Sequence, residues 1–453
     1  MKDFKKAVLR TGLAIAILGG LAIYAYHGEF KKGKEAEKAR EEAKKLFTFD
    51  RGAVTAAGIT VSGATTSCRK DGGRWTIVSP VAAAADQSAV DGVVSAMEGL
   101  RVDRVIDDRP ASLAAYGLEK PEIRVALGGP SPAPAVSVGV QNSFDNTFYV
   151  MRDGDPKVYQ ASSSIKWQLA KDLFALRDKR LFVFEKNDDI QGVQWKAGGL
   201  LFTARREGGG WGVTAGDGKK TVYSGRADDD VINGVISALR SARASSVVSE
   251  SGEGAGFGLD GAEGMVRLDR AGGITEELIF ARRQGGAAKV YARLTGSPVV
   301  WEISEQIVKD LEKKPFDVRF RKAVDFRPED ASRIIMRDGD DSWEVVKSRP
   351  DAGESGDFGP MLHSLLGMKA SGFKPVTKAA AKETSLESPS RSISVLDAGG
   401  KEIGRVELGA AAPGGVWAKS GLHPDYMLLS GDKVDGMPWK KDGLKDGPGA
   451  PRP

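Results

Sequence analysis

The sequence predicts an α+β protein made of three tandem repeats of antiparallel β-sheet, each with one or two covering helices, preceded by a single N-terminal transmembrane helix. Three observations predict this architecture. Similar motifs return at a nearly constant interval, turn formers are frequent (57 Gly and 20 Pro in 453 residues), and one uncharged apolar run lies near the N-terminus. A chain of this length is also too long for one compact core.

The apolar run covers residues 11–26 and is rich in Leu, Ile and Ala, with Lys and Arg on both flanks. Together with the apolar residues just before it, a helix here reaches the roughly 30 Å of a hydrocarbon core. No small-residue cleavage pattern follows the run, and the single cysteine, Cys68, lies too late for a lipoprotein. We therefore expect an uncleaved signal anchor in residues 1–30 that crosses the membrane through residues 7–26, in an orientation that the flanking charges do not decide.

Residues 31–45 alternate Lys and Arg with Glu at helical spacing, which indicates either a helical stalk or a flexible charged linker. The net charge of +5 resides entirely in residues 1–45, where 11 basic residues face 6 acidic ones. The rest of the chain carries 55 charges of each sign. A neutral body with mixed charges lacks the basic surface that nucleic acid requires, so we expect no nucleic-acid partner.

The repeat is clearest in its opening motif: Lys-Lys-Leu-Phe-Thr-Phe-Asp at 44–50 matches Lys-Arg-Leu-Phe-Val-Phe-Glu at 179–185. A Gly-rich turn and a tryptophan follow each motif, at Trp75 and Trp211. A helical stripe of apolar residues comes next, preceded by Asp86 in one repeat and by Asp228 in the other. We expect both aspartates to cap their helices.

Further strands and a short helix, near 165–173 and again near 304–311, complete each repeat. A third copy is more divergent: Trp343 supplies the tryptophan, residues 358–366 supply the stripe, and no clear aromatic-Gly-Leu element appears. The predicted domains are the anchor (1–30), the stalk or linker (31–45), repeat 1 (46–180), repeat 2 (181–321), repeat 3 (322–440) and a disordered tail (441–453).

The recurring tryptophans, Trp75, Trp211 and Trp343, have two interpretations. They are either a ligand platform or the large core residue against which each helix packs. Each stands in a strand-like run between a turn and a helix, which favours the core.

No residue pattern predicts catalysis, a cofactor or a metal. His27, His363 and His423 are scattered, and Cys68 has no histidine in its own repeat. The chain lacks the nucleophile-elbow, zinc-protease and phosphate-loop motifs. The Asp-Gly pairs at 153–154 and 338–339 lack the spacing of a calcium loop and indicate hairpin turns. We therefore predict no catalytic, cofactor-binding or metal-binding residues.

The order of these motifs, including Tyr-Gly-Leu-Glu-Lys-Pro at 116–121, resembles the bacterial domain-of-unknown-function family 4340 over residues 46–438. That family has no established catalytic residues. Some members are similar to components encoded beside gliding-type ABC transport systems in the cell envelope, with their repeats outside the inner membrane. The second repeat departs from the pattern at the proline, where Glu263 stands nearby.

The resemblance implies a single-pass protein of the bacterial inner (cytoplasmic) membrane, with most of the chain in the periplasm. We expect a scaffold or binding protein without catalysis, an accessory component of an ABC-type transport or envelope complex. The alternative is a ligand-binding envelope protein that captures a lipid or glycan between repeats. A deep apolar pocket lined by Trp or Tyr favours the alternative, whereas an open sheet edge or an exposed apolar patch favours the scaffold.

Overall fold

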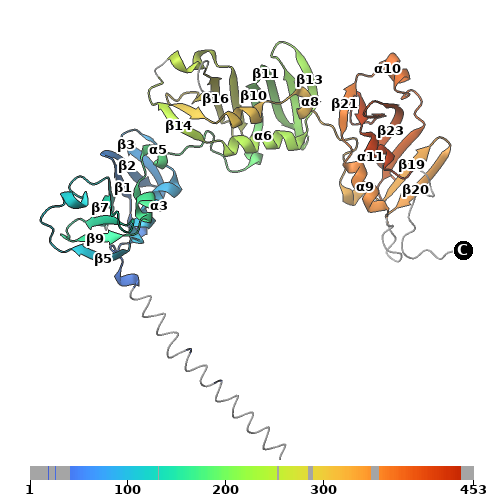
Figure 1. The fold of residues 1–453 in the computed structure, drawn as a ribbon. Helices are drawn as coiled ribbons and strands as arrows, with labels where there is room; N and C mark the ends of the chain where they lie inside the picture. Colours follow the sequence, from blue (N-terminus) through green and yellow to red (C-terminus); the bar gives the residue numbers. More distant parts are fainter. Residues whose placement is uncertain are drawn as a thin grey trace, which may run out of the picture. The chain divides into compact units, whose positions relative to one another are not determined.

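The computed structural model describes residues 41–439 apart from 131, 253–254, 284–288 and 348–356, together with residues 19 and 26. The described chain is built on three antiparallel β-sheets (Figure 1). The first two sheets have nine strands each in one common order, β4-β3-β2-β1-β6-β7-β8-β9-β5 and β13-β12-β11-β10-β15-β16-β17-β18-β14. The third has seven strands in the order β20-β19-β22-β23-β24-β25-β21. The prediction of repeated antiparallel sheets with a few helices is thus confirmed.

The strands of each sheet are short, as the frequent turn formers predict. In the first sheet they are β1 (Ala56–Val61), β2 (Ala64–Asp71), β3 (Arg74–Ser79), β4 (Ala83–Ala84), β5 (Val102–Asp107), β6 (Ile123–Gly128), β7 (Val136–Gln141), β8 (Phe148–Arg152) and β9 (Val158–Ala161). In the second they are β10 (Ile190–Ala197), β11 (Leu200–Glu207), β12 (Gly210–Gly216), β13 (Thr221–Arg226), β14 (Ala244–Ser249), β15 (Gly264–Arg270), β16 (Thr275–Arg282), β17 (Val290–Leu294) and β18 (Val300–Ile303). In the third they are β19 (Arg333–Asp338), β20 (Asp341–Val346), β21 (Ala370–Lys374), β22 (Arg391–Leu396), β23 (Glu402–Ala412), β24 (Gly415–Lys419) and β25 (Tyr426–Leu429).

Each sheet has one principal α-helix and shorter helices, which follow its last strands except for α10, which lies between β21 and β22. The α-helices are α3 (Gln87–Glu98), α4 (Ser164–Leu169), α5 (Leu173–Leu176), α6 (Asp229–Ser241), α7 (Glu305–Leu311), α8 (Pro315–Val318), α9 (Phe358–Leu366), α10 (Lys378–Glu383) and α11 (Gly431–Asp435). Single 3₁₀ turns occupy Arg51–Ala53, Ala114–Tyr116, Asn187–Asp189, Ala255–Phe257, Leu259–Gly261 and Pro328–Asp330.

The helix α3 shows how sequence determines packing. Its four apolar positions at helical spacing, Val90, Val93, Val94 and Met97, are all buried in one cluster with the inward-facing residues of the strands. The Asp86 side chain accepts a hydrogen bond from the Ala89 N–H at 3.0 Å, so its predicted role as N-cap is confirmed.

The chain divides into two compact units. The first comprises Met1–Glu185, Leu239–Ala262 and Leu278–Ile307, and the second comprises Lys186–Ala238, Glu263–Glu277 and Val308–Pro453. The boundary between the units therefore runs through the residues of the second sheet. The first sheet belongs wholly to the first unit and the third sheet wholly to the second.

The third sheet has no aromatic-Gly-Leu sequence, as expected, but a turn with the same backbone conformation stands in that place. In the first two sheets this element places a glycine at positive φ, Gly117 at 65° and Gly258 at 71°. In the third, Ser385 takes φ 56° between Thr384 and Leu386. A serine at positive φ is uncommon, so a search for glycine misses the element.

A close backbone approach confirms this equivalence. A Cβ on Gly139 would lie 2.0 Å from the Tyr116 carbonyl oxygen, and a Cβ on Gly409 would lie 2.0 Å from the Thr384 carbonyl oxygen. Leu386 packs with Tyr426. In the second sheet the corresponding Leu259 packs in one cluster with Val300 and Tyr291. In the first sheet Tyr116 meets Tyr149 edge to face, with ring centroids 5.1 Å apart.

The tryptophans are core residues, as expected, but one stands at a different position. Trp75 on β3 and Trp211 on β12 are each 2% exposed, and their indole N–H groups donate to Asp91 (2.8 Å) and Asn233 (3.3 Å). Trp343 is 8% exposed on β20, which pairs with β19 as the second strand of its sheet. Its indole nitrogen has no hydrogen-bond partner among the described residues. Trp343 is therefore not the counterpart of the other two, because it follows the first hairpin turn and they follow the second.

Several predicted segments lie outside the described residues. These are the anchor (1–30), with the exception of two residues, most of the stalk (31–45), and the tail (441–453). Within the part of the chain that the structure describes, no helix is both long enough and apolar enough to span a membrane.

Candidate functional site

The first site of interest is the segment Leu176–Leu181, which we call the first junction. It follows α5 and lies within the first compact unit. Its backbone pairs first with the segment before α3 and then with the segment after α6. Four hydrogen bonds hold it: Asp86 N–H to Leu176 O (2.8 Å), Asp178 N–H to Ala84 O (2.9 Å), Leu181 N–H to Ala242 O (3.2 Å) and Ala244 N–H to Lys179 O (2.8 Å).

The segment Val318–Ala323, the second junction, has the same design within the second compact unit. Its four backbone hydrogen bonds run from Asp228 N–H to Val318 O (2.9 Å), Phe320 N–H to Arg226 O (3.0 Å), Ala323 N–H to Met368 O (2.9 Å) and Ala370 N–H to Arg321 O (2.8 Å). The bridge between Ala85 and Arg177 in the first junction returns in the second as a bridge between Ala227 and Arg319.

Each junction contains one well-buried arginine that is paired with a carboxylate. The Arg177 side chain is 3% exposed and its Nη1 lies 2.9 Å from Glu250 Oε1, with Trp301 5.4 Å from the guanidinium carbon. The Arg319 side chain is 11% exposed and its Nη2 lies 2.8 Å from Asp425 Oδ2. The charge of each guanidinium is thus compensated, as burial of an ion requires.

The packing around Arg319 is aromatic. Its guanidinium carbon lies 3.3 Å from the ring centroid of Phe373 and 4.9 Å from that of Tyr223. His423 stacks beside Phe320 at 5.5 Å, and its Nε2 lies 2.8 Å from the Lys322 carbonyl oxygen. Rings therefore cover this arginine.

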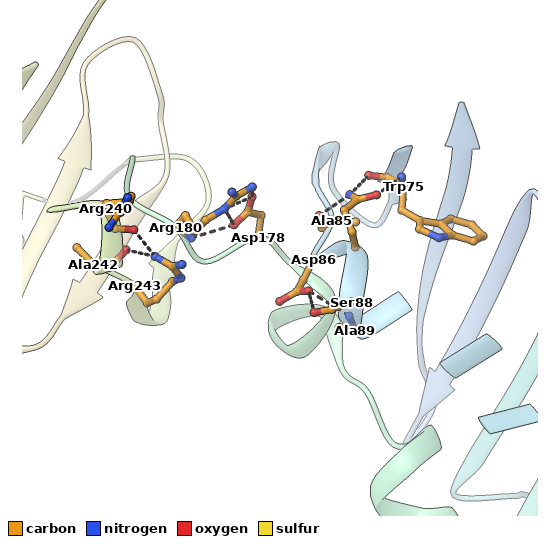
Figure 2. A network of polar contacts seen from close by, with 11 residues as sticks. Trp75, Ala85, Asp86, Ser88, Ala89, Asp178, Arg180, Arg240, Ala242 and Arg243 are labelled. Atoms are coloured by element: carbon orange, nitrogen blue, oxygen red, sulfur yellow. Dashed lines mark hydrogen bonds and ion pairs between the residues drawn. The ribbon is translucent and has the colours of Figure 1, made fainter. Parts of the chain in front are cut away.

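A polar network surrounds the first junction (Figure 2). Asp178 and Arg180 lie on the junction segment, and both oxygens of Asp178 accept from Arg180, the shortest contact being 2.6 Å to Nη2. The pKa of Asp178 is lowered: burial opposes ionisation, but the hydrogen bonds and charge of Arg180 outweigh it. In Figure 2, Arg243 lies on one side of this pair, where its Nη1 donates to the Arg240 and Ala242 carbonyls. The arrangement holds the junction segment by charge-assisted bonds.

Two cavities flank the first junction. One, of about 520 Å³, is charged and is lined by Ala85, Asp86, Gln87, Ser88, Asp178, Lys179, Arg180 and Arg243. The other, of about 470 Å³, is largely apolar and is lined by Val61, Ala64, Thr65, Thr66, Pro80, Asp172, Leu173, Phe174, Arg177, Val247, Val248, Ser249 and Glu250. Both volumes fall in the range of small-molecule sites. Neither lining contains a Trp or Tyr.

The residues considered for chemistry at the sequence level stand apart from one another. Cys68 is buried on β2, and burial raises the pKa of its thiol to about 11, so it is not a thiolate at neutral pH. His363 lies on α9 and His423 in a loop of the third sheet, both as expected. Asp153 is bound to Arg124 and Asp338 to Arg391, each at a hairpin end.

Among the described residues, no group of three or more His, Cys, Asp or Glu side chains is arranged to hold a metal ion. The sequence reading missed the junction arginines, Arg177 and Arg319. A signal for them was present, since their spacing equals that of Asp86 and Asp228, the aspartates before the helical stripes of the first two repeats.

The fold and the junctions define a tandem-repeat protein whose α+β sheets are joined by one recurring connection. The chain belongs to the family described as Domain of unknown function (DUF4340), which matches residues 75–226 and 221–389, together more than half of the chain. The first matched stretch begins on β3 and ends on β13, so the family repeat is shifted in phase from the sheets. Each matched stretch contains one whole junction.

None of the curated proteins matches this chain. Solved structures with some likeness include a DNA polymerase sliding clamp from Pseudomonas aeruginosa, at 7% identity over 86% of this chain and 94% of that chain, with a TM-score of 0.15. Another is the DNA polymerase III β chain from Streptococcus pneumoniae, at 8% identity over 88% and 97%, with a TM-score of 0.13. At these scores the likeness carries no argument about fold or function.

Proposed function

We propose that this protein is a membrane-anchored scaffold of the bacterial cell envelope, without catalysis of its own, whose repeats present a surface to protein partners. The observation that carries the proposal is the recurrence of the junction. Both junctions use the same backbone bonds and a buried arginine at the same place in the repeat, and each family repeat contains one. A repeated connection that links sheets in series is typical of proteins that display extended binding surfaces.

The anchor is the part of the proposal that rests on sequence. Residues 11–26 form an uncharged apolar run that, with the apolar residues just before it, is long enough for a membrane helix, and the charged segment 31–45 follows. We propose one crossing of the inner membrane, with the sheets in the periplasm. The ABC-type transporter as partner comes from what the family resemblance implies.

The strand β13 offers the most accessible edge for a protein partner. It is the terminal strand of the second sheet, and five of its six residues are exposed, including Val222 at 63%. An unpaired strand edge binds extended peptides by adding a strand to the sheet. The edge strand β5 is less suited, because two register shifts interrupt it.

The test is affinity purification of the full-length protein from its native membrane in mild detergent, with mass spectrometry of the proteins recovered. We expect a transporter permease and its ATPase in stoichiometric amounts. A Val222→Pro variant is expected to lose them, and the matched variant Val105→Pro on β5 is expected to keep them. Recovery of the protein alone, in several detergents, contradicts the scaffold.

A second candidate function is favoured by the apolar cavity beside Arg177. A cavity of about 470 Å³ lined mainly by Val, Leu, Phe, Pro and Ala supports capture of a lipid rather than of a glycan. The hydroxyl groups of a sugar need polar partners on several sides, whereas the surface of this cavity is largely apolar.

A further inference from the structure

We propose that the apolar cavity of the first junction binds a single-chain anionic amphiphile, with its hydrocarbon chain against the cavity wall and its carboxylate or phosphate head on Arg177. This inference rests on the second candidate function and names its ligand class. It follows from the wall of the cavity, from the state of Arg177, and from the position of Glu250.

The wall of the cavity suits a hydrocarbon chain. The apolar lining comes from the β1–β2 hairpin, from the residue after β3, from α5 and from β14, which together supply Val61, Ala64, Pro80, Leu173, Phe174, Val247 and Val248. Val248 is 37% exposed, although it is a large apolar residue. Covering this surface with a hydrocarbon chain removes it from water, at about 25 cal/mol for each Å² buried.

Arg177 supplies the attachment point for an anionic head. Its side chain is only 3% exposed and lines the cavity, yet its Nε has no hydrogen-bond acceptor among the residues that the structure describes. A buried donor without an acceptor is costly, and a carboxylate or phosphate oxygen satisfies it. The guanidinium fork matches the planar, two-oxygen head of a carboxylate, which is the geometry that arginine recognises best.

Glu250 is the group that the ligand head replaces. Its Oε1 lies 2.9 Å from Nη1 and its Oε2 3.0 Å from Nη2 of Arg177, so a carboxylate already occupies one end of the guanidinium. A ligand head that takes its place and shifts toward Nε also gives that donor its missing acceptor. The Glu250 side chain is 38% exposed and can turn into solvent when a ligand carboxylate takes its place. The buried guanidinium therefore keeps a counter-ion throughout the exchange.

The other carboxylate in the lining has a separate structural role. Asp172 accepts from the Ala175 N–H at 2.7 Å and caps α5. Trp301, at 5.4 Å from the guanidinium carbon, holds Arg177 by a cation–π contact that does not involve Glu250. The arginine thus stays in position while its anionic partner changes.

The experiment is photo-crosslinking of the full-length protein in lipid nanodiscs with a palmitate analogue that carries a diazirine on its chain. Labelled peptides are mapped by mass spectrometry, and unlabelled palmitate, hexadecyl phosphate and hexadecanol compete. We expect label on 61–66, 173–174 and 247–248. We expect either anionic competitor to suppress it at about tenfold lower concentration than hexadecanol, the effect of one charged hydrogen bond. Whether palmitate or hexadecyl phosphate competes better distinguishes the two heads.

Four variants sharpen the test. Arg177→Met is expected to lose the label, and Glu250→Gln to raise it severalfold because the internal competitor is gone. Ala64→Trp, an exposed residue of the lining, fills the cavity without touching Arg177 and is expected to lose the label even if Arg177→Met fails to fold. The matched control Arg319→Met in the second junction keeps the label.

Two results overturn the inference. Equal competition by hexadecanol shows that a lipid binds without recognition of its head, which removes the anionic class but leaves the second candidate function standing. Label that persists in Ala64→Trp shows that the probe does not occupy this cavity. That result contradicts both the anionic-amphiphile inference and the second candidate function. The scaffold is judged separately, by recovery of the transporter with the Ala64→Trp variant.

Discussion

The two junctions share one backbone design but differ in what surrounds the arginine. At Arg319 the rings of Phe373 and Tyr223 lie against the guanidinium. At Arg177 one indole lies at 5.4 Å and an apolar cavity opens beside it. The backbone bonds are the same in number and direction, so the difference lies entirely in side chains. The backbone hydrogen bonds determine how the chain connects the sheets. The side chains determine whether aromatic rings or a cavity lie beside the arginine.

The largest effect is expected from Arg319→Met. Removal of this guanidinium leaves the half-buried Asp425 carboxylate without its partner and removes the contacts with Phe373 and Tyr223. We expect the free energy of local opening at the second junction to fall by about 3 kcal/mol, the loss typical of one partner of a buried pair. Hydrogen exchange of the Asp228 and Phe320 amides measures it.

The matched variant is Arg177→Met, read from the Asp86 and Asp178 amides. Its effect is expected to be smaller, because Glu250 is 38% exposed and recovers hydration when it is released. If Arg177→Met lowers protection as much as Arg319→Met or more, the aromatic rings around Arg319 add nothing to the stability of the second junction.

A second test removes one of the aromatic rings that pack around the arginine of the second junction. Phe373→Ala removes the ring nearest to Arg319, and we expect a loss of about 2 kcal/mol, less than for a fully buried Phe because Phe373 is half-buried. Val248→Ala, in the cavity lining of the first junction, is expected to cost less than about 0.5 kcal/mol. Thermal unfolding of both variants measures the two losses, and similar values would contradict the comparison.

A third test concerns the carboxylates. Glu250→Gln is expected to cost about 2 kcal/mol, because the 3% exposed Arg177 side chain loses its counter-ion while the amide, at a 38% exposed position, still accepts a hydrogen bond from it. Asp425→Asn is expected to cost more, because the Asp425 side chain is 26% exposed against 38% for Glu250 and its partner Arg319 is stacked on rings. Urea unfolding at pH 7.5 compares the two losses of stability. A larger loss for Glu250→Gln would contradict the predicted difference between the junctions.

The smallest effect concerns pH. Burial lowers the pKa of His423 below its ordinary 6.5, and the charges of Arg319 and Arg226 lower it further, whereas the Lys322 carbonyl and Asp425 raise it. Below about pH 6.5 the unfolded state therefore binds more protons than the folded state, and stability falls as the pH decreases. Protection of the amides near the second junction against hydrogen exchange should fall between about pH 7.5 and pH 5.5. The change should be absent in His423→Gln, and its persistence there would assign the effect to another group.

Sequence periodicity predicted the elements that repeat and missed those that depend on conformation. Asp86 as N-cap and Trp75 as a core residue follow from local patterns. The turn in the third sheet that takes the place of the aromatic-Gly-Leu element was missed, because Ser385 adopts a conformation that is typical of glycine. Trp343 was misplaced, since a turn followed by a tryptophan does not tell which hairpin the turn belongs to.

The candidate site was the harder prediction. Arg177 and Arg319 stand among other basic residues, and only the pairing of the chain shows which of these is buried. The cavity beside Arg177 is formed by residues that lie far apart along the chain, from Val61 to Glu250. No local sequence pattern therefore predicts this cavity.

One pairing near the N-terminus bears on how this chain gained its length. Leu46 N–H donates to Leu100 O at 2.9 Å and Val102 N–H to Lys44 O at 2.9 Å, the same two bonds that open the second and third sheets. The first sheet thus makes the same two bonds with residues 44–46 that the second and third sheets make with their junctions. Gene duplication can insert another repeat at this position, because the bonds that join it to the first sheet already exist. Relatives with more or fewer repeats should therefore differ in length by whole repeats.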